Sequence, residues 1–194
     1  MVADEKAQRI LDAARTILAQ QGYMAMTVSQ VAETAGVSRG LLHYYFKNKE
    51  DLLARVIRSS LEKTVELVQL MFAQSATADE IATGLTGALR YLDQVAPDVF
   101  NLLFEGWAVA RQSELVAAEM AELFRQFHAA MLSALEEAAA RGVIAPTVPL
   151  DGLAVLLSGL MDGLALQVIT TPELVENDAV WHTTQQAVLG LLGG

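Results

Sequence analysis

The chain has 194 residues, a formal net charge of −10, no cysteine, 53% hydrophobic residues and a mean hydropathy of +0.34. The lack of cysteine excludes a disulfide framework, a thiolate metal site and a cysteine nucleophile. The N-terminal residues are charged and lack the apolar core of a signal peptide, so we expect a cytoplasmic protein.

The charge is distributed unevenly along the chain. Residues 1–63 contain nine Lys or Arg and seven Asp or Glu, a net of +2, whereas residues 64–194 contain four and sixteen, a net of −12. Between Thr34 and Lys49 there are three basic residues, Arg39, Lys47 and Lys49, and no acidic one. A polyanion is therefore expected to bind the N-terminal part, because the acidic remainder repels it.

The first two predicted helices have clear ends. Apolar residues recur with a period of 3.6 from Ala7 to Leu18, and Gly22 is a suitable stop for that helix. Thr27 and Gln30 then form a capping box that opens a second, shorter helix.

A tight turn leads from the second helix to a third. The second helix is predicted to end at Ala35-Gly36, and Ser38 is the N-cap of the third. Val37 and Leu42 form a hydrophobic staple across this cap. Two short capped helices joined in this way can place the second of them in the DNA major groove.

Helical patterns continue through the middle of the chain. Asn48 caps a fourth helix that runs to about Gln74, and residues 77–80 have the form of another capping box. Pro97 breaks the helix that follows. A long helix is predicted from Ser113 until Arg141-Gly142.

Two further helices are predicted near the C-terminus. One runs from Leu150 to about Ile169, and Thr171-Pro172 caps the last, which ends near Leu192. The segment 152–171 is long enough for a membrane span, but Asp162 near its middle would cost about 2.5–3.5 kcal/mol. We therefore interpret it as a buried helix and expect no membrane partner. About nine helices without a strand pattern predict an all-α fold.

The residue types of the third helix suit a helix that reads base edges. Arg39 lies in the first turn, where its guanidinium can reach guanine O6 and N7, and Gly40 permits a close approach. Leu41 offers an apolar contact to a thymine methyl group, and Tyr44 suits a base or a sugar. Phosphate contacts are predicted for His43, Tyr45, Lys49 and Thr27. The alternative is a packed three-helix corner without DNA affinity.

This stretch resembles the N-terminal domain of the TetR family of bacterial transcriptional regulators over about residues 8–55. The matching residues are Thr27-Val28, Val31-Ala32, Ala35-Gly36-Val37-Ser38-Arg39-Gly40-Leu41-Leu42, Tyr45-Phe46, Lys49-Glu50 and Leu52. The resemblance implies that the first three helices bind DNA and that Ser38–Tyr44 is the recognition helix. His43 is a departure, because the family most often has a tyrosine there; histidine still donates to a phosphate.

The C-terminal half resembles the family less closely. Residues 160–172 are similar to the second-last helix of the betaine-inhibitor-type branch. In the family the last two helices pair with those of a second subunit, which implies a homodimer. The residues predicted to permit this close helix approach are Gly152, Leu156, Gly159, Leu160 and Gly163.

Aromatic and methionine residues gather in the predicted central helices, where they either line an effector pocket or form an ordinary bundle core. Trp107, Arg111 and His128 are the better pocket candidates because each adds a polar group. The predicted ligand-binding residues are Phe72, Phe104, Trp107, Arg111, Phe124, Phe127 and His128.

No pattern of an enzyme or a metal protein is present in the sequence. Phosphate-loop, dinucleotide and nucleophile-elbow motifs are missing, and the three histidines do not share ligand spacing with acidic residues. We therefore expect no cofactor, no metal and no catalytic residue.

The sequence thus predicts a DNA-binding domain at residues 1–46 and an effector-binding and dimerisation domain at residues 47–194. The function expected is that of a ligand-responsive repressor, which binds a palindromic double-stranded operator as a dimer and is released by a small, mainly apolar effector. The fourth helix is the expected connection between pocket and DNA-binding domain. A transcriptional activator, a small-molecule carrier that has lost operator binding, and an enzyme using the apolar cavity remain alternatives.

Overall fold

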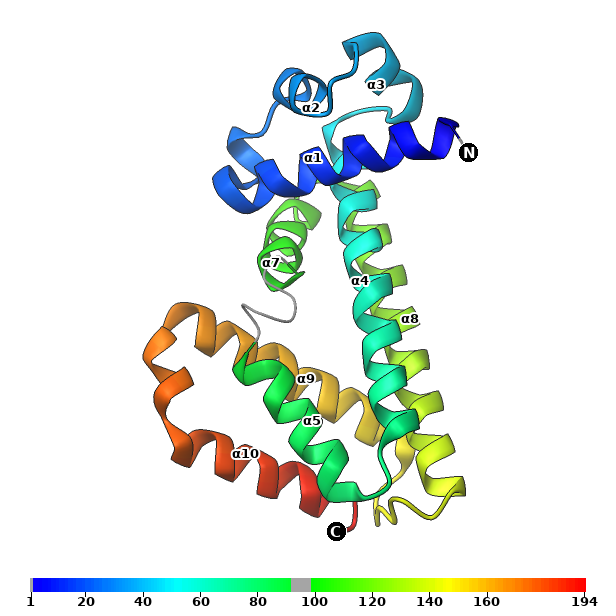
Figure 1. Ribbon diagram of the computed structural model, residues 1–194, viewed down its shortest axis with the longest axis vertical. Helices are drawn as coiled ribbons and strands as arrows, with labels where there is room; N and C mark the ends of the chain where they lie inside the picture. The colour runs from blue at the N-terminus through cyan, green and yellow to red at the C-terminus, as the bar shows by residue number, and fades with distance from the viewer. Residues whose placement is uncertain (1, 92–98) are drawn as a thin grey trace. The chain divides into compact units, whose positions relative to one another are not determined.

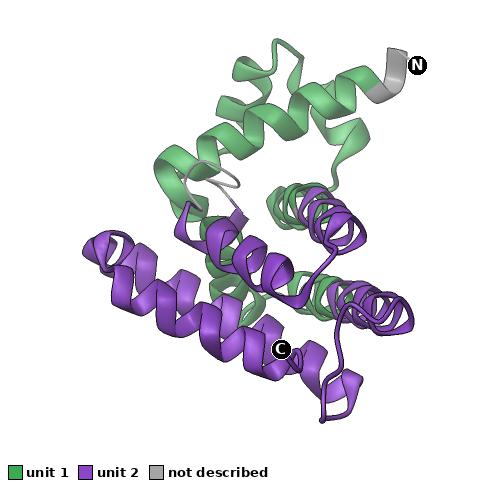
Figure 2. Cartoon of the chain, turned by 60° about the horizontal axis from the view of Figure 1, so that its bottom comes forward, with its two compact units in different colours: residues 1–62, 101–124 green, residues 63–100, 125–194 purple. Residues whose placement is uncertain are grey.

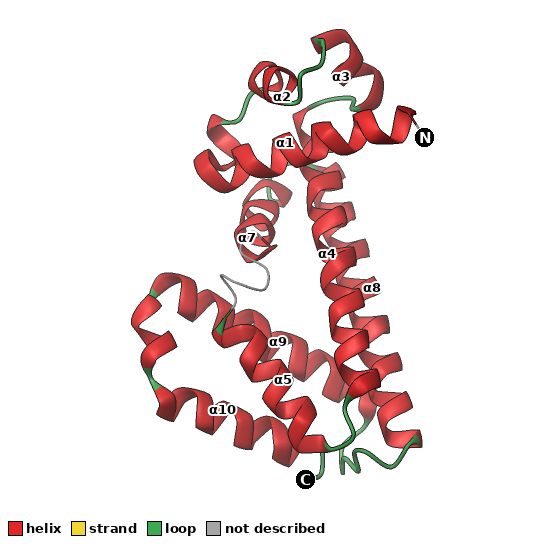
Figure 3. Ribbon diagram, viewed as in Figure 1, coloured by secondary structure: helices red, strands yellow, loops and turns green. Residues whose placement is uncertain are grey.

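A computed structural model of the chain describes residues 2–91 and 99–194, and Figure 1 shows its helices. This described part contains nine α-helices, one 3₁₀ turn and no strand, as Figure 3 shows by colour. The helices are α1 (Val2–Ala25), α2 (Val28–Thr34), α3 (Arg39–Tyr45), α4 (Lys49–Gln74), α5 (Ala78–Arg90), α7 (Val99–Ala110), α8 (Glu114–Ala140), α9 (Leu150–Thr170) and α10 (Asp178–Leu191), with the 3₁₀ turn η1 at Pro172–Glu176. The all-α prediction is confirmed, while the break predicted at Pro97 lies outside the described residues.

The chain forms two compact units, drawn in green and purple in Figure 2. Unit 1 comprises Met1–Glu62 and Asn101–Phe124, and unit 2 comprises Lys63–Phe100 and Arg125–Gly194. The division by packing therefore falls within α4, α7 and α8, not at residue 46. The boundary predicted at residue 46 divides DNA binding from effector binding, whereas the two units are defined by contacts between residues. The functional division therefore stays a prediction.

Unit 1 is built around the apolar face of α1. Ile10 and Ala14 are fully buried, as the period of 3.6 predicts, and α1 contacts both α2 and α3. Gly22 interrupts α1 with φ of +73°, so the expected stop is present as a kink before the last residues of the helix. Gly106 of α7 is also buried here, and a Cβ on it would lie 2.7 Å from the sulfur of Met120 and 2.8 Å from Ile57 Cδ1. Glycine therefore allows α7 to pack closely on α4 and α8 within this unit.

Unit 2 has its own apolar core, to which α4, α5, α8, α9 and α10 contribute residues such as Phe72, Ile81, Met131, Leu153 and Val188. Each such side chain stabilises the fold by about 1.5–3 kcal/mol when it is removed from water. The core holds α5 between α9 and α10, with which it makes contacts.

Arg141, at the end of α8, caps the C-terminus of α4 in unit 2. Its guanidinium donates to the carbonyls of Phe72 at 2.6 Å, Ala73 at 3.1 Å and Ser75 at 3.3 Å. These carbonyls have no partner within their own helix, and the negative end of the helix favours a cation. The long-range cap fixes where α4 ends.

The last helix begins later than we predicted. Thr171 makes no side-chain capping bond, and Pro172 opens only the 3₁₀ turn η1. The cap of α10 is Asn177, whose side-chain oxygen accepts from the amide of Ala179 at 3.2 Å. The indole of Trp181 donates to the carbonyls of Leu174 and Val175, at 3.0 and 3.1 Å, and this fixes the turn.

The prediction that residues 152–171 form a buried helix is also wrong. Helix α9 has the predicted extent, but it buries only Leu153, Ala154, Leu157 and Ala165. Its opposite face is exposed in the single chain, because none of the described residues of unit 2 covers it. By length and composition alone, α9 is the one helix among the described residues that is long and apolar enough to cross a membrane.

Candidate nucleic-acid interface

The start of α2 has the capping box that the sequence predicts. Thr27 Oγ1 accepts from the amide of Gln30 at 3.2 Å, and Gln30 Oε1 accepts from the amide of Thr27 at 2.9 Å. Met26, just before the cap, is buried with 1% of its surface exposed. Thr27 is therefore held at the surface with its hydroxyl group beside the first amides of α2.

The turn between α2 and α3 depends on Gly36. This residue has φ of +62°, and a Cβ on it would lie 2.9 Å from a guanidinium nitrogen of Arg9. The same guanidinium donates to the carbonyl of Ala35 at 2.5 Å and so ties α1 to the turn. The following Ser38 accepts from the amide of Leu41 at 3.1 Å, which confirms it as the cap of α3.

Helix α3 buries one face and exposes the other. Leu42 and the following Phe46 each have 1% of their surface exposed and anchor the helix in unit 1. On the outer face Arg39, Gly40 and His43 are exposed, and the side chain of Tyr44 is 80% exposed. Figure 1 shows α2 and α3 on the same side of α1. The helix thus presents the predicted base-reading side chains to solvent.

Among the residues that the structure describes, no acidic side chain pairs with the cation at the start of α3. Within the described residues, Arg39 makes neither an ion pair nor a side-chain hydrogen bond, and it is exposed. Leu41 is half-buried beside it. A free guanidinium in the first turn of an exposed helix has the geometry required to reach a guanine edge.

Tyr45 belongs to the flank of α3. Its ring is half-buried and meets the ring of Tyr44 edge-on at 5.2 Å between centroids. It also lies 6.5 Å from the ring of Phe46. These contacts limit the positions available to Tyr44, so a large exposed side chain is partly ordered before any DNA is present.

Lys49, at the start of α4, is held more tightly than a surface lysine. Its ammonium lies 4.1 Å from the centroid of the Tyr23 ring and donates to the carbonyl of Met24 at 3.3 Å. Burial lowers the pKa of Lys49, while the negative charges of Glu105 and Glu50 act in the opposite direction. The phosphate contact predicted for Lys49 must therefore compete with contacts inside the protein.

The sequence analysis missed Tyr23 and Met24 as members of this surface. The side chain of Met24 is 88% exposed, and both residues position the Lys49 ammonium. No local pattern in the sequence marked these two residues, because their contacts with Lys49 join positions 25 and 26 residues apart.

The predicted ligand-binding residues are divided between the two units. In unit 1, Trp107 of α7 lies 5.4 Å from the ring of Phe104 and stacks on Phe124 of α8 at 5.7 Å between centroids, 8° from parallel. Arg111, also in unit 1, follows α7 and is exposed. The three aromatic residues thus form one cluster.

The remaining three predicted ligand-binding residues lie in unit 2. Phe72 is 1% exposed within the core, and Phe127 packs against that core. His128 Nε2 lies 2.9 Å from Asp151 Oδ1, whereas its Nδ1 is buried without a hydrogen-bond partner among the described residues. That these residues share a pocket with the aromatic cluster of unit 1 stays a prediction.

The residues predicted for the dimer interface lie on α9. A Cβ placed on Gly152, Gly159 or Gly163 would meet no atom within 4 Å among the described residues, apart from its own turn of α9. Leu156 is 51% exposed beside them, and Leu160 lies at the edge of this face, half-buried. Val155 and Leu166, which are 58% and 46% exposed, extend this exposed face of α9.

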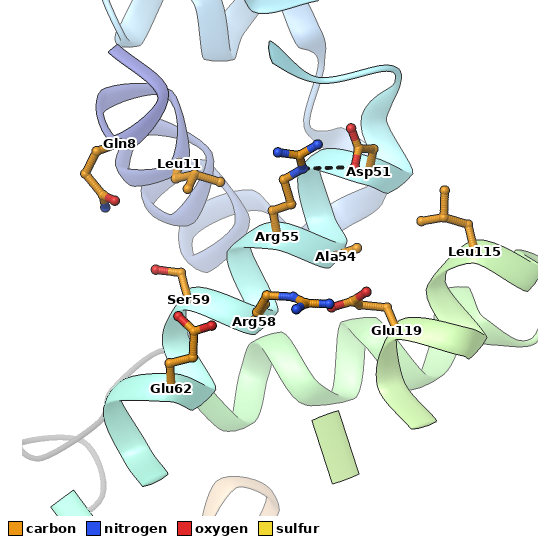
Figure 4. Close-up of a pocket in the computed structure, with 10 residues that line it drawn as sticks. All are labelled: Gln8, Leu11, Asp51, Ala54, Arg55, Arg58, Ser59, Glu62, Leu115 and Glu119. Carbon is orange, nitrogen blue, oxygen red and sulfur yellow. Dashed lines mark hydrogen bonds and ion pairs between the residues drawn. The ribbon is translucent and has the colours of Figure 1, made fainter. Parts of the chain in front are cut away.

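Unit 1 also contains two cavities that the sequence did not predict. Figure 4 shows the first, of about 600 Å³, where Arg58 of α4 pairs with Glu119 of α8 and its Nε donates to Oε1 at 2.6 Å. The second, of about 520 Å³, is lined by residues of α1 and α7, with Phe104 and Glu105 among them. Charged side chains line both cavities. The described residues contain no group of three His, Cys, Asp or Glu arranged to hold a metal ion.

Comparison with known proteins identifies the class of this fold and surface. Residues 10–56 match the family model of bacterial regulatory proteins of the tetR family, and residues 77–193 match the C-terminal model of BetI-type transcriptional repressors. The HTH-type transcriptional regulator BetI of Rhizobium meliloti (strain 1021) is 30% identical over 158 residues, which cover 81% of this chain and 75% of the relative. The chain therefore belongs to the TetR family of transcriptional regulators, which are regulators and not enzymes.

Solved structures agree in fold. FadR from Bacillus subtilis in complex with stearoyl-CoA has a TM-score of 0.70 at 23% identity, covering 94% of this chain and 97% of FadR. A transcriptional regulator from Saccharomonospora viridis in complex with choline has a TM-score of 0.73 at 20% identity, covering 95% of this chain and 94% of that one. At these identities the likeness shows the shared fold alone.

Proposed function

We propose that the protein is a cytoplasmic, ligand-responsive repressor that binds a palindromic operator as a homodimer. The observation that supports this most is the outer face of α3, where a capped helix exposes Arg39, Gly40, His43 and Tyr44 and leaves Arg39 without an acidic partner among the described residues. The functional domains proposed are residues 1–46 for DNA binding and residues 47–194 for effector binding and dimerisation.

In this proposal α3 enters the major groove from its N-terminal end. Arg39 donates to a guanine edge, Gly40 permits close approach, and Leu41 and Tyr44 contact a thymine methyl group and a base or sugar. Ser38 orients the helix as its cap. Phosphates are contacted by Thr27, His43, Tyr45 and Lys49.

The exposed face of α9 is the proposed dimer interface. Gly152, Gly159 and Gly163 lie in open space and allow close approach of a second helix, while Leu156 and Leu160 supply apolar area. Covering this face would also remove a row of exposed apolar side chains from water. Two recognition helices would then engage half-sites about 34–36 Å apart.

The proposed effector is a small, mainly apolar molecule. Support comes from the aromatic cluster of Phe104, Trp107 and Phe124, and from structural neighbours that hold stearoyl-CoA or choline. Phe72, Arg111, Phe127 and His128 complete the proposed ligand set. The effector releases the operator only to the extent that it binds the DNA-free state more tightly than the DNA-bound state.

Selection of bound fragments from a genomic DNA library, followed by fluorescence anisotropy on the enriched duplex, tests the proposal. We expect a palindromic sequence bound at least about a thousandfold more tightly than unrelated duplex at physiological salt. Equal affinity for every duplex would favour the carrier, and a reporter gene that rises when the protein is expressed would favour an activator.

A further inference from the structure

The ammonium group of Lys49 lies at a junction of three helices in unit 1. It belongs to α4, while the aromatic ring and the carbonyl that hold it, from Tyr23 and Met24, belong to the end of α1. The third helix is α7, which contributes the carboxylate of Glu105. A predicted DNA contact is thus in the electrostatic field of a helix from which we predict no DNA contact.

Steric contacts place Glu105 at this junction independently of its charge. A Cβ on Gly22 would lie 2.7 Å from Glu105 Oε1, so the carboxylate occupies the space beside the kink of α1. Gly22 is followed directly by Tyr23 and Met24, the two residues that hold Lys49. Within the described residues Glu105 makes no side-chain hydrogen bond, which leaves its carboxylate to act through its charge.

The position of Glu105 follows the position of α7. Gly106, the next residue, packs against Ile57 and Met120 too closely to accept a side chain without a shift. Trp107 stacks on Phe124, so α7 is fixed to α8 by the same aromatic cluster that we propose for the effector. A ligand that displaces this cluster would therefore move Glu105 relative to Lys49.

We propose that Glu105 is a positioning residue that attracts the Lys49 ammonium, which the Tyr23 ring and the Met24 carbonyl hold by direct contact, and thereby weakens its contact with a DNA phosphate. A carboxylate attracts the ammonium away from the phosphate and repels the phosphate itself. An effector that moves Glu105 closer to Lys49 would strengthen both effects and favour release of the DNA, which links the aromatic cluster to DNA affinity without passing through the length of α4. The inference rests on the proposed function, because it takes Lys49 as a phosphate contact.

A double-mutant cycle with Lys49→Ala and Glu105→Gln tests the proposal without knowledge of the operator or effector. Binding of the full-length protein to a labelled duplex of mixed sequence is measured by anisotropy from about 50 to 200 mM salt. We expect Glu105→Gln to tighten binding by about threefold to tenfold at the lowest salt. In the Lys49→Ala background the same change should alter binding by less than about twofold.

Two further variants separate charge from structure. Glu105→Asp keeps the carboxylate and should bind DNA as the unchanged protein does. Glu114→Gln removes an exposed carboxylate from the first turn of α8 in the same unit, and its effect on binding should be the same with and without the Lys49→Ala substitution. Side-chain NMR should also show that Glu105→Gln lowers the pKa of Lys49, because one of its two opposing carboxylates is removed.

The outcomes are distinguishable. An equal gain from Glu105→Gln in both backgrounds would show a general charge effect and overturn the inference while leaving the proposed function intact. If Lys49→Ala changes neither the affinity nor the salt slope, the assignment of Lys49 to a phosphate fails, and the inference fails with it. The inference would also be overturned if Glu105→Gln weakened DNA binding while Glu105→Asp bound DNA as the unchanged protein does. The carboxylate would then favour the phosphate contact of Lys49.

Discussion

The indole of Trp107 and the ring of Phe124 lie 5.7 Å apart and only 8° from parallel, and this stack joins α7 to α8 within unit 1. Offset stacked rings contribute about 0.5–1.5 kcal/mol beyond the burial of their area. Since Phe104 lies against the same indole at 5.4 Å, the stack is the centre of the aromatic cluster.

Trp107→Ala is expected to separate ligand response from DNA binding. Operator affinity without effector should change by less than about twofold, because Gly106 still packs against Ile57 and Met120 and keeps α7 in place. Ligand-dependent release should need at least about tenfold more effector, a loss of about 1.4 kcal/mol. Anisotropy of operator DNA titrated with the effector measures both. Trp181→Phe, in unit 2, is the control and should respond as the unchanged protein does. Loss of the folded dimer in Trp107→Ala would instead assign Trp107 to the core.

Arg39→Ala should weaken operator binding by about 1–3 kcal/mol and relax the preference at one base position. The reason is that a bidentate contact to guanine is lost while the phosphate contacts remain. Affinities for single-base variants of the selected operator provide the measurement. Lys63→Ala removes an exposed cation from α4 and serves as the control. An Arg39→Ala protein with an unchanged base preference would contradict the proposed role.

Ser38→Ala should lower the free energy of unfolding by about 0.5–2 kcal/mol, because the amide of Leu41 loses its side-chain acceptor. Ser38→Gly should cost only a few tenths of a kcal/mol, since glycine is a tolerated N-cap. Urea unfolding of both variants measures the difference. An unchanged free energy of unfolding in Ser38→Ala would mean that the hydrogen bond from the Leu41 amide does not stabilise α3.

Leu156→Arg is expected to dissociate the dimer, since it would place a charge in the centre of the proposed α9 interface. The matched control is Leu115→Arg, because Leu115 is a leucine of similar exposure, 42% against 51%, that lies on α8 in unit 1. Analytical ultracentrifugation should find monomers for the first variant and dimers for the second. A dimeric Leu156→Arg protein would place the interface elsewhere.

Asp162 gives α9 a pH-dependent contribution to stability. Burial raises its pKa from 3.8 to about 6, so between these values the folded chain binds a proton that the unfolded chain has released. Stability from this group is therefore present at low pH and is lost as the pH rises to about 6. Thermal unfolding at about pH 4 to 7 should show a smaller decline for Asp162→Asn than for the unchanged protein. If the stabilities of the two proteins declined equally with pH, the raised pKa of Asp162 would be contradicted.

The sequence by itself determined the parts of this protein that depend on neighbours in the chain. The caps at Thr27 and Ser38 and the extent of α9 follow from side chains close together in the chain, and all three are confirmed. The stop predicted at Gly22 is present as a kink, after which α1 continues to Ala25. The exposed face of α3 was predictable for the same reason, because helical periodicity assigns residues to faces before any tertiary contact forms.

Only the tertiary structure decided which helices meet. The ring of Tyr23 against Lys49, the stack of Trp107 on Phe124 and the Arg141 cap of α4 join residues 26, 17 and about 68 positions apart, and no local spacing encodes them. The late start of α10 has a shorter-range origin, because Asn177 caps the helix and the indole of Trp181 bonds carbonyls only six and seven residues before it. The contacts between distant residues depend on how the apolar faces pack together, which is a property of the whole folded chain.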